Sequence, residues 1–172
     1  MRNKINEFIF RVDVTKEVGI GHLKRMINFG NQLNVEKKNI TWFIKGSKEI
    51  AKSIFNKNNF KNIFYLKNDG KKKIVKFMQS KKINFIFFDL CHKKNMQKKF
   101  IQNYINYFKK NGFITVSFEH PNIKTSSNIS INPYMFKNKI VRKRGKVKLS
   151  GHKYFIFSKK ISNYLKKRKK IR

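Results

Sequence analysis

Near the start of the chain, a histidine follows two glycines in the sequence Gly19-Ile20-Gly21-His22. A neutral imidazole accepts a proton near pH 7, so a histidine beside a substrate can act as a general base. Glycines let the backbone approach a ligand closely, and the free amides of a helix N-terminus favour an anion while disfavouring imidazolium. These residues predict base catalysis next to a bound phosphate. The alternative is a tight turn in which His22 only caps the helix.

This turn lies between a predicted strand and a predicted helix. Apolar, β-branched residues precede it, and apolar residues recur at helical spacing after it. The turn lacks the third glycine of the dinucleotide fingerprint and the Lys-Ser/Thr of a P-loop. Its spacing alone therefore does not identify the ligand.

Strands and helices alternate along the first two thirds of the chain. The predicted strands cover residues 7–12, 40–44, 62–66, 83–88 and 113–116, and the predicted helices cover residues 21–33, 47–55, 71–80 and 95–110. This alternation predicts an α/β fold, a Rossmann-like doubly wound parallel sheet with helices on both faces. After residue 121 we expect a short strand at 129–131, an extended stretch at 154–157 and a basic helix at 159–169.

The chain has only eight acidic residues, and three of them follow predicted strands: Asp13, Asp89 and Glu119. The carboxyl ends of parallel strands meet at the sheet edge where open α/β folds bind ligands. We therefore expect a functional cleft at this edge.

Two of these acids and two nearby arginines have alternative predicted roles. Asp13 either orients His22 or binds a sugar hydroxyl, and Arg11 supports the glycine loop. Arg25 is predicted to bind a phosphate, to close the end of a strand by contacting it, or to be a solvated helix residue. Asp89 belongs to the cleft or caps the helix that follows it.

Several segments occur in the order found in one known family. They are residues 10–13 (FRVD), 19–25 (GIGHLKR), 28–33 (NFGNQL), 84–89 (NFIFFD), 116–119 (VSFE), 128–132 (NISIN) and 151–154 (GHKY). In this order they resemble the UDP-2,4-diacetamido-2,4,6-trideoxy-β-L-altropyranose hydrolases of pseudaminic acid biosynthesis and the related spore coat polysaccharide biosynthesis proteins. The resemblance spans nearly the whole chain and implies the N-terminal half of a two-domain GT-B fold.

The resemblance also implies a reaction and a set of site residues. His22 would be the catalytic base that activates water against the anomeric carbon of a UDP-linked sugar, with no cofactor and no metal. The implied substrate-binding residues are Arg11, Asp13, Gly19, Ile20, Gly21, Arg25, Asp89, Cys91, Glu119, Asn132 and Tyr154.

Two features depart from the family pattern. The family's Asp-His-Tyr reads Asp89-Leu90-Cys91 here, so a tyrosine thought to touch substrate is missing. The family also has a C-terminal UDP-binding domain, which we expect to be absent from this chain. The expected organisation is one domain at residues 1–157 followed by a basic helix or tail at 158–172. A separate chain would then have to supply the UDP-binding half.

Composition limits the class of protein. No apolar run approaches the roughly 20 residues that a membrane span needs, and the polar N-terminus does not resemble a signal peptide, so we expect a cytoplasmic protein. The single cysteine, Cys91, excludes an internal disulfide. His92 and His120 lie near Cys91 and two of the acids, but their spacing matches no zinc motif.

The formal net charge of +35 suggests an anionic partner. Against this, lysines are spread along the whole chain together with many Asn, Ile and Phe residues, as coding bias would produce. Two basic runs stand apart, at 137–148 and 166–170, and such runs are usually solvated. Neither has the aromatic interleaving of single-strand binders, so we expect no specific nucleic-acid partner. Three classes remain open: a UDP-sugar hydrolase that is truncated or split, a non-catalytic nucleotide-sugar-binding fragment, and a basic polyanion-binding scaffold.

Overall fold

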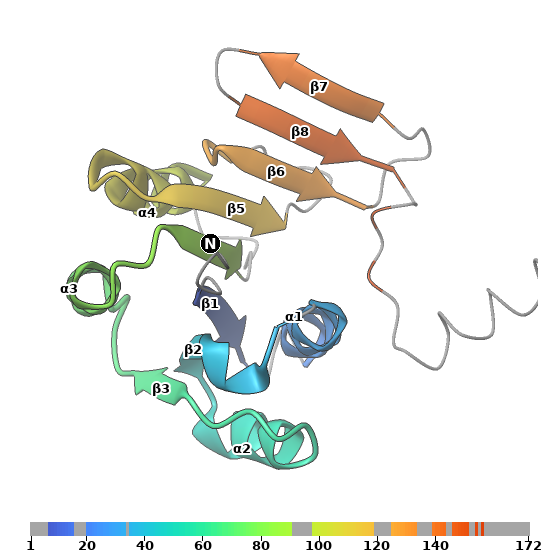
Figure 1. Ribbon diagram of the computed structural model, residues 1–172, viewed down its shortest axis with the longest axis vertical. Helices are drawn as coiled ribbons and strands as arrows, with labels where there is room; N and C mark the ends of the chain where they lie inside the picture. The colour runs from blue at the N-terminus through green and yellow to red at the C-terminus, as the bar shows by residue number, and fades with distance from the viewer. Residues whose placement is uncertain are drawn as a thin grey trace, which may run out of the picture.

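The computed structural model describes residues 7–15, 20–33, 35–90, 98–118, 125–133, 139–143, 146–151, 154 and 156. Within this part of the chain, eight strands form one sheet in the order β3-β2-β1-β4-β5-β6-β8-β7 (Figure 1). The strands are β1 (Phe8–Val14), β2 (Ile40–Gly46), β3 (Ile63–Leu66), β4 (Phe85–Asp89), β5 (Ile114–Phe118), β6 (Ile129–Asn132), β7 (Lys139–Lys143) and β8 (Lys146–Ser150). Neighbouring strands are parallel, except that β7 runs antiparallel to β8.

Helices cover both faces of this sheet (Figure 1). The helices are α1 (Gly21–Gln32), the short 3-10 helix η1 (Lys37–Asn39), α2 (Lys48–Asn56), α3 (Lys71–Ser80) and α4 (Lys98–Lys110). The side chains of α1 and α2 pack against one face of the sheet, and those of α3 and α4 pack against the other. The strand order and the two helical layers confirm the predicted Rossmann-like doubly wound α/β fold.

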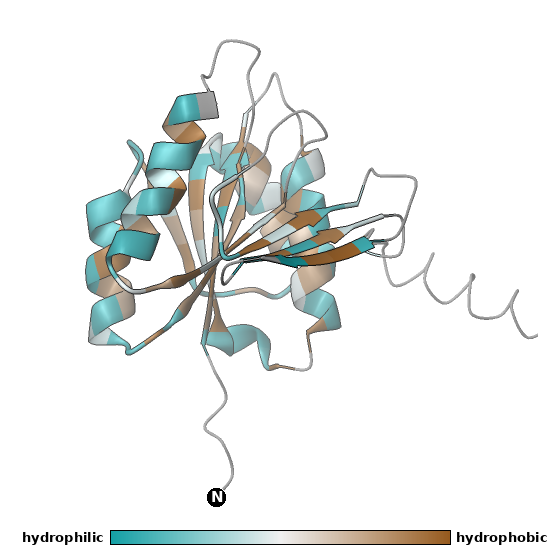
Figure 2. Ribbon diagram, turned by 90° about the horizontal axis from the view of Figure 1, so that it is seen from above, coloured by the Kyte–Doolittle hydropathy of each residue, from teal (hydrophilic) through white to brown (hydrophobic). Residues whose placement is uncertain are grey.

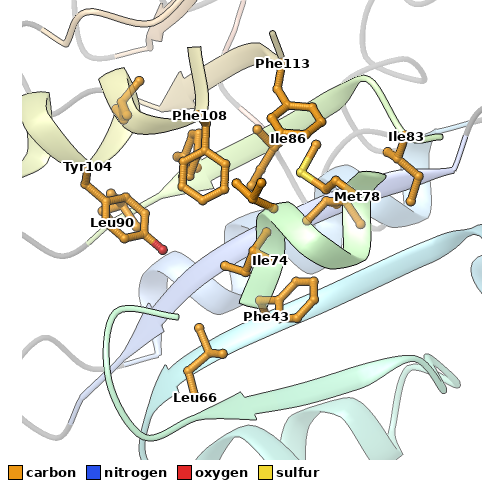
Figure 3. Packing of buried hydrophobic residues seen from close by; sticks show 14 of the residues in the cluster. Phe43, Leu66, Ile74, Met78, Ile83, Ile86, Leu90, Tyr104, Phe108 and Phe113 are labelled. Carbon is orange, nitrogen blue, oxygen red and sulfur yellow. The ribbon is translucent and has the colours of Figure 1, made fainter. Parts of the chain in front are cut away.

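The two cores follow from the alternation of side chains along each strand. Phe10, Trp42 and Phe87 face α1 and α2 in what we call the α1-side core. The neighbouring residues Phe43 and Phe88 face α3 and α4 in the α4-side core, shown in Figure 3. Because both faces of the central strands are buried, these strands are almost continuously apolar, as the sequence predicted.

Glycines are required at two points of close packing. A Cβ at Gly30 would lie 3.2 Å from the Phe60 ring and 3.3 Å from the Phe10 ring, so its absence lets α1 sit close to the sheet. Gly46 ends β2 with φ +118°, and a Cβ there would overlap the carbonyl oxygen of Val14. This second glycine allows β1 and β2 to end side by side at the carboxyl edge of the sheet.

The direction of winding reverses between β1 and β4. From β1 the chain proceeds to β2 and β3 on one side, then returns through α3 to place β4 on the other side of β1. In open α/β sheets such a switch point leaves a crevice beyond the carboxyl ends of the two strands. The register pairs Val12 with Asp89, so the end of β4 lies beside the end of β1.

The basic run at 137–148 is not simply a solvated charged segment, because most of it forms the β7–β8 hairpin. In β8 lysines alternate with Val147 and Leu149, which pair with Ile129 and Ile131 of β6. These apolar side chains thus share one face of the sheet, and Figure 2 shows brown residues within this hairpin. Because lysines occupy the alternate positions, the period-two pattern of a strand was not recognised in this basic run.

Other sequence predictions for this end of the chain have mixed outcomes. The strand expected at 129–131 is confirmed as β6. Tyr154 is not extended as expected, because its amide donates a hydrogen bond to the Gly151 carbonyl oxygen in a tight turn (3.1 Å). The expected basic helix at 159–169 lies outside the described residues. No helix in the described ranges is long and apolar enough to cross a membrane.

Candidate functional site

Three side chains from two elements meet at the switch point. His22 Nδ1 lies 2.5 Å from Asp89 Oδ1. Arg25 binds the same carboxylate through both oxygens, with Nε 2.7 Å from Oδ2 and Nη2 2.6 Å from Oδ1. The structure therefore brings together a histidine, an arginine and an aspartate that the sequence had predicted only as separate site residues.

The local sequence explains this geometry. His22 and Arg25 are three residues apart on α1, so both project from the same side of the helix. Asp89 is the last residue of β4 and shares the α1-facing side with Phe87, two residues earlier. The Arg25 guanidinium also lies over the Phe118 ring at the end of β5, 5.7 Å from the ring centroid. Packing from a third element therefore fixes the position of the arginine.

The arrangement suits a proton acceptor. The Asp89 side chain is fully buried and accepts two hydrogen bonds from the Arg25 guanidinium. In the tautomer that carries its proton on Nδ1, His22 donates to Asp89 and keeps a lone pair on Nε2. Arg25 Nη2 lies 3.3 Å from the same Nδ1. The His22 side chain is 21% exposed, so the ring is accessible to a substrate or water.

The N-terminus of α1 lies directly beside this cluster. Within the described residues no side chain caps it, and its first turn contains no acidic residue. Gly21 is exposed, and a Cβ placed on it would meet nothing within 4 Å. First-turn amides and the positive end of a helix dipole favour an anion. Ile20 precedes the helix as its half-buried N-cap residue.

The prediction that Asp13 orients His22 is wrong. Asp13 and Arg11 alternate with the α1-side residues of β1, so both face α4 across the sheet. Arg11 Nη1 donates to Asp13 Oδ1 at 2.7 Å, and Arg11 Nε donates to the Tyr104 hydroxyl at 3.1 Å. Arg11 therefore pairs with Asp13 and α4, while Asp89 has the orienting position next to His22.

The environment of this second pair shifts two pKa values. Burial is the largest influence and lowers the pKa of Arg11, but the charge of Asp13, the Tyr104 hydroxyl and the hydrogen bonds to both together outweigh it, so the net pKa is raised. Burial raises the pKa of the Tyr104 hydroxyl, and Arg11 opposes this only in part. The Tyr104 hydroxyl donates to the carbonyl oxygen of Asp69 at 2.6 Å. The network is therefore a protonated tyrosine linked to a fixed ion pair.

A shallow hollow lies over this pair at the carboxyl edge, with about 280 Å³ of empty space that includes open solvent. Its lining comprises Arg11, Asp13, Lys45, Asp69, Leu90, Phe100, Ile101 and Tyr104. Sequence reasoning missed Lys45, Asp69 and Tyr104 as site residues. Tyr104 belongs to the apolar stripe of α4, so its spacing indicated only a core position.

The remaining predicted residues lie elsewhere. Asn132 is buried at the end of β6, two strands away from β4, and its carbonyl accepts the Gly151 amide at 3.0 Å. The Tyr154 amide bonds to the Gly151 carbonyl, and the Gly151 amide in turn bonds to the Asn132 carbonyl. The positions of Gly19, Cys91 and Glu119, and of the two histidines considered for a metal site, His92 and His120, lie outside the described residues.

No group of three His, Cys, Asp or Glu side chains that could hold a metal ion occurs in the part of the chain described here. The site as described thus consists of His22, Asp89 and Arg25 beside the open N-terminus of α1. No protein-family model matches the sequence, and no curated protein is significantly similar to it.

Proposed function

We propose that the chain is the catalytic half of a nucleotide-sugar hydrolase, in which His22 activates water and UDP is released from a diacetamido-trideoxy sugar. The observation that carries this proposal is the His22–Asp89 hydrogen bond at the switch point, with Arg25 holding the carboxylate. The substrate identity rests on the family resemblance of the sequence motifs. The geometry supports the reaction type.

In the proposed reaction His22 Nε2 takes a proton from water. The water oxygen forms a bond to the anomeric carbon, and the bond between that carbon and the UDP oxygen breaks. UDP leaves with the bonding electron pair, which becomes a lone pair on its terminal phosphate oxygen. The buried Asp89 carboxylate stabilises the imidazolium that forms, because the hydrogen bond from Nδ1 becomes charge-assisted.

The neighbouring groups have distinct tasks in this scheme. The first turn of α1 offers backbone amides to the phosphate side of the substrate, and exposed Gly21 permits close approach. Arg25 is a positioning residue, because it acts on His22 through Asp89. Its position corresponds to the predicted role of closing the strand end, rather than to a solvated helix residue.

The proposal includes a partner. A GT-B-like site needs a second half to bind the uridine, and we propose that such a UDP-binding partner completes the site. A nucleotide-sugar substrate favours a cytoplasmic location for the reaction.

The test is a UDP-release assay on purified chain with UDP-2,4-diacetamido-2,4,6-trideoxy-altrose, with and without the protein encoded by the adjacent reading frame. We expect release that falls by about 10²- to 10⁴-fold in His22→Ala, the usual contribution of a general base. Dependence on the second protein would identify a split enzyme. Binding of the UDP-sugar without turnover would show the non-catalytic alternative, and unchanged release in His22→Ala would contradict the proposed base.

A further inference from the structure

Charge is distributed unequally along the chain. Beyond Asp89, the sequence contains only one acidic residue, Glu119, while lysines and arginines continue to its end. Every carboxylate side chain within the described residues precedes Leu90. The part of the sheet from β5 to β7 therefore carries positive charge with few carboxylates to balance it.

The register of the hairpin gathers lysines on one face. Lys139 pairs with Ser150, and Val141 pairs with Lys148, so these four residues share one side of the sheet. Lys146 lies two residues before Lys148 and therefore on the same side, about 6.7 Å away along the strand. Lys139 and Lys146 are exposed, and Lys148 is half-buried. We call Lys139, Lys146 and Lys148 the lysine face.

A further lysine is crowded against this face. Lys109, in the last turn of α4, donates from Nζ to the Ser126 carbonyl oxygen at 2.8 Å. Its partial burial lowers its pKa, and the positive charge of Lys146 lowers it further. Like charges are therefore held near one another by the fold, and an anion would relieve this repulsion.

We propose that the lysine face binds the phosphate backbone of double-stranded nucleic acid without regard to base sequence. Lysines act as point charges that neutralise successive phosphates. β7 is the last strand of the described sheet, so the hairpin lies at an edge of the sheet (Figure 1). The lysine face as defined carries no arginine or aromatic side chain that would read bases.

A membrane surface fits this face less well than a duplex. An interfacial element places apolar side chains beside its basic ones on the same side. Here Val141, 37% exposed, is the one exposed apolar side chain of the described hairpin residues on the lysine side, and Ile140, which is 50% exposed, pairs with Leu149 on the opposite side. The lysines and the most exposed apolar side chain of the hairpin therefore cannot contact one planar surface together.

This binding is separate from the proposed hydrolysis. The lysine face lies on the α4 side of the sheet, because Val147 and Leu149 share the α1 side with Ile129 and Ile131, whereas His22 belongs to α1 itself. A nucleic acid on the lysine face would thus leave His22 accessible.

The experiment measures binding of the full chain to a labelled 20-base-pair duplex over a salt series. One variant carries Lys139→Gln, Lys146→Gln and Lys148→Gln. The matched control carries Lys52→Gln, Lys72→Gln and Lys76→Gln, which remove the same charge from exposed positions on α2 and α3. We expect the lysine-face variant to bind at least tenfold more weakly at about 0.1 M salt, with the slope of log K against log salt reduced by about 0.9 for each phosphate that is no longer neutralised. The control should stay within about threefold of the unmodified chain.

Equal weakening in both triple variants would overturn the proposal, because only total charge would then matter. Absence of duplex binding, or stronger binding to phosphatidylserine vesicles that depends on the same lysines, would also overturn it. UDP release is also measured on the lysine-face variant, and we expect the release rate to equal that of the unmodified chain. A failure of duplex binding is then distinguishable from a failure of the proposed hydrolysis.

Discussion

Two arginine–aspartate pairs lie at the carboxyl edge of the sheet, one on each face. Arg25 and Asp89 face α1, and Arg11 and Asp13 face α4. Each guanidinium also lies over an aromatic ring, that of Phe118 at 5.7 Å and that of Tyr104 at 5.6 Å. Among the described residues, only the first pair contacts a histidine. Two similar buried ion pairs therefore differ in the side chain beside them, which is His22 for one and Tyr104 for the other. Of these two side-chain types, only histidine ordinarily exchanges a proton near neutral pH.

The largest effect is expected from Asp89→Asn. This change removes the Asp89 charge from the mostly buried Arg25, so unfolding free energy should fall by about 3–5 kcal/mol. UDP release should also be abolished in the protein that remains folded, because His22 loses its orienting carboxylate. Urea denaturation and the release assay measure the two effects separately. The double variant Asp89→Asn with Arg25→Met should regain stability but not activity, and a regain of both would contradict the role of Asp89.

Asp13→Asn breaks the other pair and is expected to affect stability alone. Arg11 keeps its bond to the Tyr104 hydroxyl, so the fall in unfolding free energy should lie at the lower end of about 3–5 kcal/mol. UDP release per folded molecule should match that of the unmodified chain, since Asp13 faces away from His22. A large fall in release at full folding would mean that the hollow over Arg11 belongs to the reaction.

Tyr104, which contacts the Arg11–Asp13 pair, is expected to make the stability of the chain depend on pH in the alkaline range. Its folded-state pKa is raised by burial, so the stability it contributes is present below the ordinary tyrosine pKa of about 10 and is lost as pH rises through the folded value. Thermal unfolding from pH 8 to 11 should show this fall in the unmodified chain and a flatter profile in Tyr104→Phe. Tyr107→Phe is the matched control from the same helix, and a profile flattened equally in the control would contradict the assignment.

The smallest change in stability is expected from Gly21→Ala at the first turn of α1. A Cβ has open space there, and alanine restricts the unfolded chain more than glycine does, so stability should rise by about 0.4–1 kcal/mol. If phosphate approaches this turn, the added methyl group should still weaken UDP-sugar binding, measured by calorimetry. Binding that is unaffected would place the phosphate elsewhere.

Much of the fold could be predicted because its signals are local. Apolar runs and helical spacing place α3 at the predicted residues, and the ends of α1, α2 and β2 within two residues of prediction. The hairpin was missed because lysines occupy one of its faces, although Lys146-Val147-Lys148-Leu149 alternates as a strand does.

The site was predictable in its members but not in their arrangement. His22, Arg25 and Asp89 were each singled out from motif and strand-end positions. Which carboxylate meets His22 depends on the strand order and on the face that α1 covers, and neither is encoded locally. Asp13 is nearer in the sequence, but side-chain alternation along β1 turns it to the other face.

The central claim is that His22 removes a proton from the attacking water. Its most direct test is UDP release by His22→Ala, together with any partner chain that release requires, measured with and without added imidazole. The account predicts a rate about 10²- to 10⁴-fold below that of the unmodified protein, partly restored by imidazole in His22→Ala and not in Asp89→Asn, where His22 still occupies the space. An unchanged rate in His22→Ala would contradict it.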